Sequence, residues 1–143
     1  MKKVNIILIL IIVTNSLFAF AENNRDDLYI VFGSGYINDT ISLSINDISV
    51  MEKIVLKSDS IGDVCYNGGV IMRDGVLNTI SQDLNEKEIL FQYSDKLKII
   101  MTVNGRPYEL VANLKKGKYI VISKHWYYYN VYLNQFKRPV SSE

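Results

Sequence analysis

Residues 97–112 read LKIIMTVNGRPYELVA, and this stretch decides the fold class. Its first half places an apolar side chain at every second position, which is typical of a half-buried β-strand. The alternating apolar residues are Leu97, Ile99, Met101 and Val103. Asn104-Gly105 follows at once, and this dipeptide favours a type I′ turn because both central residues need a positive φ. The stretch therefore predicts a β-hairpin.

A two-residue turn also fixes the register of that hairpin. The predicted pairs are Val103 with Arg106, Met101 with Tyr108, Ile99 with Leu110 and Leu97 with Ala112. Most of these pairs are apolar, so we expect one face of the hairpin to be buried, and a shift by one residue would lose that pattern. Pro107 has no N–H to donate, so we expect it at an edge strand or at a non-bonded position.

Similar signals recur along the chain. Strands are expected at 28–32, 41–45, 48–56, 70–73, 76–79 and 88–93, with turns at Asn46-Asp47 and Asp74-Gly75. A further hairpin is expected to join residues 118–123 to 127–133 through Lys124-His125-Trp126. The best candidate for a helical turn is 81–90. The pattern predicts an all-β chain, an antiparallel β-sandwich (Greek-key or jelly-roll-like) of about eight or nine short strands.

The amino terminus resembles a secretory signal peptide. Lys2 and Lys3 precede an apolar run at 4–13, and Ala19-Phe20-Ala21 is an A-x-A cleavage site before polar residues. The run is shorter than the roughly 20 residues of a membrane-spanning helix. We therefore expect residues 1–21 to be a signal peptide and residues 22–143 to be a single domain. Because no cysteine lies near the cleavage site to carry a lipid anchor, we expect a soluble protein in the periplasm or outside a bacterial cell, without stable membrane insertion.

Charge is spread unevenly along this expected domain. Residues 22–95 carry 13 acidic and 5 basic side chains, whereas residues 96–143 carry 9 basic and 2 acidic ones. The two halves either neutralise each other in the fold or leave a basic face for an anionic partner. The near-zero balance of the whole argues against nucleic-acid binding.

The inventory of reactive residues is sparse. Cys65 and His125 are the only cysteine and histidine, which is too few ligands for a structural zinc site. Cys65 cannot form an intramolecular disulfide, and we expect it to be buried. Gly33-Ser34-Gly35 has no expected helix after it, so it is interpreted as a turn and not as a phosphate-binding loop. We predict no catalytic residue, no metal site and no cofactor.

The most unusual feature is aromatic. Six of the ten tyrosines fall between Tyr108 and Tyr132. If residues 127–133 form one strand, Tyr127 and Tyr129 share the core face with Val131 and Leu133. The opposite face then carries the candidate ligand- or partner-binding residues, which are Trp126, Tyr128, Asn130, Tyr132 and Asn134. Ordinary cross-strand packing of aromatic residues is the alternative explanation. Nearby lysines at 115, 116, 118, 124 and 137, with Arg138, would favour anionic ligands.

These observations favour an exported, non-enzymatic binding module. The first expectation is a protein-interaction domain of the cell envelope, of an accessory, inhibitor or immunity type. The alternative is a carbohydrate-binding module that uses the tryptophan, tyrosines and asparagines of the last strand. A hydrolase on a sandwich scaffold is a third hypothesis.

Overall fold

The computed structural model describes residues 28–58, 65–81, 88–92 and 94–139, and this part of the chain is all β. These residues form ten strands and no helix. The strands are β1 (Leu28–Phe32), β2 (Asp39–Ile45), β3 (Ile48–Leu56), β4 (Cys65–Arg73), β5 (Val76–Ser81), β6 (Glu88–Leu90), β7 (Lys96–Val103), β8 (Arg106–Asn113), β9 (Tyr119–Lys124) and β10 (Val131–Phe136). Within the described part of the chain, no helix is long and apolar enough to cross a membrane.

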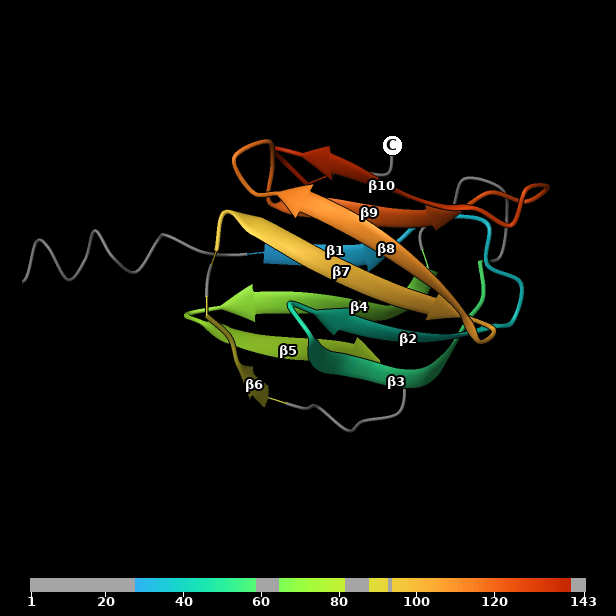
Figure 1. Ribbon diagram of the computed structural model, residues 1–143, viewed down its shortest axis with the longest axis horizontal. Coiled ribbons are helices and arrows are strands. Elements are labelled where there is room, and N and C mark those ends of the chain that lie inside the picture. The colour runs from blue at the N-terminus through green and yellow to red at the C-terminus, as the bar shows by residue number, and fades with distance from the viewer. Residues whose placement is uncertain (1–27, 59–64, 82–87, 93, 140–143) are drawn as a thin grey trace, which may run out of the picture.

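The strands form two sheets, and the smaller one lies over the larger one (Figure 1). The larger sheet has six strands in the order β10-β9-β1-β4-β5-β6, and the smaller sheet has four in the order β3-β2-β7-β8. Ile30 and Val70 of the larger sheet join Leu43 and Ile99 of the smaller sheet in one buried apolar cluster. Because period-two alternation turns every second side chain inward, both sheets contribute to this core.

The hairpin at 97–112 is confirmed residue by residue. Val103 pairs with Arg106, Met101 with Tyr108, Ile99 with Leu110 and Leu97 with Ala112. Asn104 and Gly105 have φ values of 50° and 83°, as a type I′ turn requires. Pro107 lies on β8, which is an edge strand of the smaller sheet.

The expected purely antiparallel arrangement is wrong at one place. β1 pairs with β4 in the antiparallel direction but with β9 in the parallel direction, Tyr29 lying opposite Tyr119. Parallel neighbours cannot be joined by a tight turn and need a long connection. Here that connection is the whole chain from β2 to β8, and alternation within a strand carries no information about such a distant partner.

Two smaller expectations also need correction. The described residues form ten strands where about eight or nine were expected. The helical turn suggested for 81–90 is contradicted at both ends, because Ser81 closes β5 and Glu88–Leu90 forms β6. β6 pairs with β5 through Leu77 and Ile89, so sheet formation overrides any local helical preference. Residues 82–87, and the expected signal peptide at 1–21, lie outside the described residues.

The opposite charges of the two halves of the sequence meet in the fold. Lys115 lies 3.0 Å from Asp95, Lys124 lies 2.7 Å from Asp39, and Lys98 lies 3.9 Å from Asp47. Each pair joins a base of residues 96–143 to an acid of residues 22–95. The two halves therefore neutralise each other at these three pairs, of which only Lys124–Asp39 is buried.

Candidate functional site

The β9–β10 hairpin ends in a loop of aromatic residues at one end of the molecule. Lys124 pairs with Val131 in the sheet, and the His125 N–H donates to the Asn130 carbonyl over 2.7 Å. The chain must therefore reverse direction across residues 126–129. We call residues 125–130 the tyrosine loop; it projects at the right-hand end of Figure 1.

This placement corrects the expected strand at 127–133. β10 begins only at Val131, so the predicted alternation of faces fails for residues 127–130 and holds from Val131 onward. Tyr127 and Tyr129, which were expected in the core, are 85% and 65% exposed. The reversal is set by the sheet register and the closing hydrogen bond, which override the strand propensity of consecutive aromatic residues.

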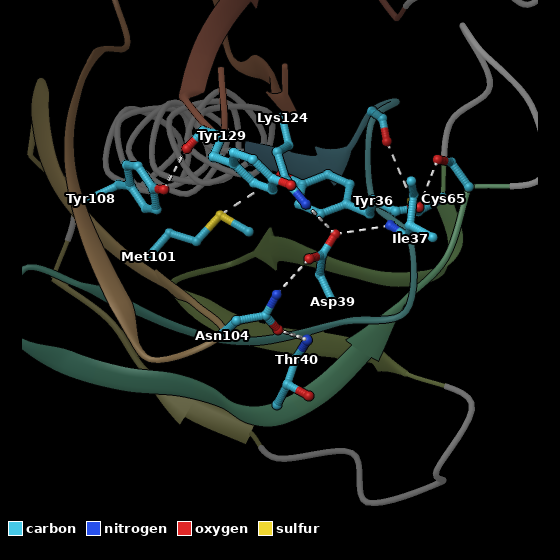
Figure 2. A network of polar contacts seen from close by, with 12 residues as sticks. Tyr36, Ile37, Asp39, Thr40, Cys65, Met101, Asn104, Tyr108, Lys124 and Tyr129 are labelled. Carbon is cyan, nitrogen blue, oxygen red and sulfur yellow. Dashed lines mark hydrogen bonds and ion pairs between the residues drawn. The ribbon is translucent and has the colours of Figure 1, made fainter. Parts of the chain in front are cut away.

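A buried ion pair lies beneath the loop (Figure 2). Lys124 Nζ lies 2.7 Å from Asp39 Oδ2, and the two side chains are only 8% and 4% exposed. Asp39 begins β2 in the smaller sheet and Lys124 ends β9 in the larger one, so this pair ties the two sheets together. An ion pair removed from water is strongly destabilised when one partner is lost, because the other charge is then left uncompensated.

Further hydrogen bonds complete the surroundings of the Asp39 carboxylate. Oδ2 also accepts the Ile37 N–H at 2.8 Å, and Oδ1 accepts the Asn104 side-chain amide at 2.6 Å. Asn104 Oδ1 in turn accepts the Thr40 N–H at 2.9 Å. Asn104, in the turn of the β7–β8 hairpin, thus joins the start of β2 to the ion pair, and the loops at this end of the molecule are held as one unit.

The tyrosine loop rests on this unit through Tyr129. The Lys124 ammonium lies 5.5 Å from the centre of the Tyr129 ring, within the range of a cation–π contact. The Tyr108 hydroxyl on β8 donates to the Tyr129 carbonyl at 2.5 Å. Tyr129 has φ 49°, a left-handed conformation that is costly for a bulky residue and that persists only where the surroundings enforce it. These contacts therefore fix the backbone of the loop.

Other side chains of the loop point away from the molecule. Tyr127 and Tyr128 are 85% and 78% exposed. His125 Nδ1 accepts the Tyr127 N–H at 3.3 Å, and its ring lies 4.7 Å from that of Tyr128. Trp126 is half-buried, and its Nε1 is the buried side-chain polar atom without a hydrogen-bond partner among the described residues. The loop combines an anchored backbone with large exposed rings.

Tyr36 lies in the core at this end of the molecule and contacts β9. Its ring is fully buried and meets Phe32 edge-on, and its hydroxyl donates to the Ile122 carbonyl at 3.1 Å. Burial raises the pKa of the Tyr36 hydroxyl far above its usual range, with smaller contributions from Cys65, Asp39 and Tyr132. The phenol is therefore neutral and serves as a structural donor. Cys65 is buried, as expected, and its thiol donates to the Gly33 carbonyl.

The structure divides the five candidate residues between two surfaces. Trp126, Tyr128 and Asn130 lie in the tyrosine loop, whereas Tyr132 and Asn134 lie on β10 and face outward from the larger sheet. Tyr132 is 42% exposed. The candidates therefore do not form the single strand face that was expected.

The expected basic surroundings of the aromatic residues are wrong. β9 runs from the lysine-rich turn at 115–118 to the tyrosine loop, and β10 runs back from the loop toward Lys137 and Arg138. Those bases therefore lie at the opposite end of the two strands, about 20 Å away for a six-residue strand. Lys124 does lie under the loop, but its charge is paired with Asp39.

Four residues of this site were not identified from the sequence, which are Asp39, Asn104, Tyr108 and Tyr36. Asp39, Asn104 and Tyr108 support the loop from strands or turns that are distant in sequence, whereas Tyr36 hydrogen-bonds to β9 at Ile122. No local spacing pointed to any of the four. The Asn104-Gly105 dipeptide did locate the turn, but the side-chain contact with Asp39 depends on how the two sheets meet. Among the described residues, no group of three or more His, Cys, Asp or Glu side chains could hold a metal ion.

Comparison of the chain with protein-family models, with curated proteins and with solved structures gave no match.

Proposed function

We propose that the protein is an exported, non-enzymatic binding module, built as a β-sandwich, that contacts a protein partner through the tyrosine loop. The exposure of Tyr127 and Tyr128 on an anchored backbone is the observation that carries this proposal. Tyrosine offers large contact area at low cost in conformational entropy, and a preorganised loop loses little further freedom on binding. The signal-like segment at 1–21 supports the exported location, in the periplasm or outside the cell.

The orientation of the rings favours protein over sugar. The His125 ring is tilted by 46° to that of Tyr128 and by 54° to that of Tyr127, so these three rings do not share one plane. A stacking platform for sugar rings needs coplanar aromatic faces, whereas a protein partner can pack around tilted rings on a projecting turn. The carbohydrate-binding alternative is therefore less well supported.

Site-specific photocrosslinking tests the proposal in the envelope of the producing cell. A photoreactive phenylalanine analogue at Tyr128 should give a discrete adduct with one protein. The matched control places the same analogue at Val111, which is 61% exposed on β8, and should not give that adduct. No adduct at Tyr128, or the same adduct from both positions, would contradict the proposal. Specific retention on a glycan array would instead support the carbohydrate alternative.

A further inference from the structure

The outer face of the larger sheet is apolar over its centre. The register places Phe136, Tyr119, Tyr29 and Ile71 side by side in one row across four strands. A second row carries Val121, Val31 and Ile80. Phe136 and Ile80 are 40% and 44% exposed, and the others are half-buried by their neighbours on the same face. Tyr29 and Tyr119 stack with ring centres 5.0 Å apart.

The smaller sheet provides an internal comparison. Its outer face carries polar side chains, among them Ser42, Ser44, Lys98 and Thr102. A sheet with one face in water shows this alternation of apolar and polar residues, whereas strands covered on both faces read as continuous apolar runs. β1 reads LYIVF and β9 begins YIVI. The continuous apolar runs of these central strands are therefore typical of a sheet that is covered on both faces.

Charges flank this apolar face at one end. Lys137 and Arg138 follow β10 at one edge of the sheet, and Asp74 and Glu88 lie near β6 at the other edge. All four lie toward the end of the sheet at which β10 finishes. β4 and β10 run in the same direction, and Asp74 follows β4. Glu88 lies in the same row as Ile71 and Phe136, through Asn78. Arg73 is a basic residue next to Asp74, but it takes part in an interaction within the chain and is not counted among these flanking charges.

We propose that this face packs against the same face of a second copy of the chain, about a two-fold axis that runs along the central strands. Such an axis places β10 of one copy over β6 of the other at the same end. Lys137 and Arg138 then face Glu88 and Asp74 of the second copy, twice in the symmetric pair. The surface is distinct from the tyrosine loop, which stays exposed at the other end of β10.

The remaining segments of the expected mature chain do not suit this face. Residues 22–27, 59–64, 82–87 and 140–143 lie outside the described residues, and their sequences are mostly polar. An apolar surface of this kind marks an association site in a soluble protein. A second copy supplies both an apolar face of equal shape and the opposite charges at the two edges.

Sedimentation of the protein recovered after export tests the assembly. We expect twice the mass of one chain throughout the micromolar range. Ile71→Lys should raise the dimer dissociation constant about 100-fold or more, because an unpaired charge would be buried in each half of the interface. Ile100→Lys is the matched control, since Ile100 is half-buried on the outer face of the smaller sheet, and it should stay dimeric. Both variants are checked for cooperative unfolding.

Charge exchange provides a second test that does not depend on Ile71→Lys folding. Lys137→Glu with Arg138→Glu should weaken self-association, and so should Glu88→Lys with Asp74→Lys. A mixture of the two variants should form heterodimers, because each acidic edge then meets a basic one. A monomeric parent chain, a dimer that survives Ile71→Lys, a dimer lost equally in Ile100→Lys, or the absence of heterodimers would each overturn the proposal. Unlike the crosslinking at Tyr128, these measurements do not involve the tyrosine loop.

Discussion

Lys124 Nζ lies 2.7 Å from Asp39 Oδ2 in the interior, and this pair links the two sheets directly beneath the tyrosine loop. The same ammonium contacts the Tyr129 ring from below. The loop that we propose to bind a partner is therefore coupled to the stability of the fold.

Removal of one partner of this ion pair should be strongly destabilising. Asp39→Ala leaves a buried ammonium uncompensated, so we expect the free energy of unfolding to fall by about 3–5 kcal/mol. Lys115 and Asp95 provide the control, because their side chains are 74% and 57% exposed, and Asp95→Ala should cost about 1 kcal/mol or less. Urea denaturation measures both values. Equal losses of unfolding free energy in the two variants would show that burial does not determine how much an ion pair contributes to stability.

The Tyr36 hydroxyl should make stability depend on alkaline pH. Because its pKa is raised in the folded state, folding favours the neutral phenol, and this contribution is fully present below the usual value of 10.0. It is lost as pH rises from there toward the folded-state pKa. Tyr36→Phe should cost about 1 kcal/mol near neutral pH through the lost hydrogen bond.

To test this, the free energy of unfolding of the wild type and of Tyr36→Phe is measured at a series of pH values. The advantage of the wild type should shrink above pH 10 and then reverse. Tyr127→Phe is the control, because it removes a phenol hydroxyl at a position that is 85% exposed. A constant difference between wild type and Tyr36→Phe across this range would contradict the assigned cause.

Loss of the Tyr108 hydroxyl should loosen the tyrosine loop while leaving the sheets intact. Tyr108→Phe removes the hydrogen bond to the Tyr129 carbonyl and should cost about 1 kcal/mol of stability. Amide exchange at His125, whose N–H donates to the Asn130 carbonyl across the loop, should accelerate, whereas that at Ile99 in the buried β7 should follow only the global change. If exchange at the two amides changes by the same factor, Tyr108 does not act locally on the loop. Crosslinking at Tyr128 should become less efficient in this variant.

Two glycines separate the effect of backbone conformation from that of close contact. Gly35 has φ +97°, and a Cβ there would lie 1.7 Å from the Lys124 carbonyl oxygen. Gly105 has φ +83°, and a Cβ there would have no neighbour within 4 Å. Gly105→Ala should cost about 1–2 kcal/mol from conformation alone. Gly35→Ala should cost clearly more, because the backbone next to the ion pair must move. Equal losses in thermal or urea denaturation would refute this difference.

The sequence alone determined those local features that a turn signal and the alternation beside it specify together. The alternation of residues 97–103 and the Asn104-Gly105 turn predicted the complete register of the β7–β8 hairpin, because a two-residue turn leaves a single pairing that buries one face. Turn chemistry likewise located the Asn46-Asp47 and Asp74-Gly75 turns. These predictions succeeded because each depends on residues that are neighbours in the chain.

Only the tertiary structure decided the parallel pairing of β1 with β9, the Asp39–Lys124 pair and the position of the tyrosine loop. The strand pairing and the ion pair join residues that are far apart in sequence, and the position of the loop depends on those contacts. The aromatic residues at 126–129 have strong strand propensity, yet the register of β9 with β10 turns them into a loop. Propensity is a property of a residue and its neighbours, whereas the direction of a strand and the end at which a loop projects are set by how the sheets pack.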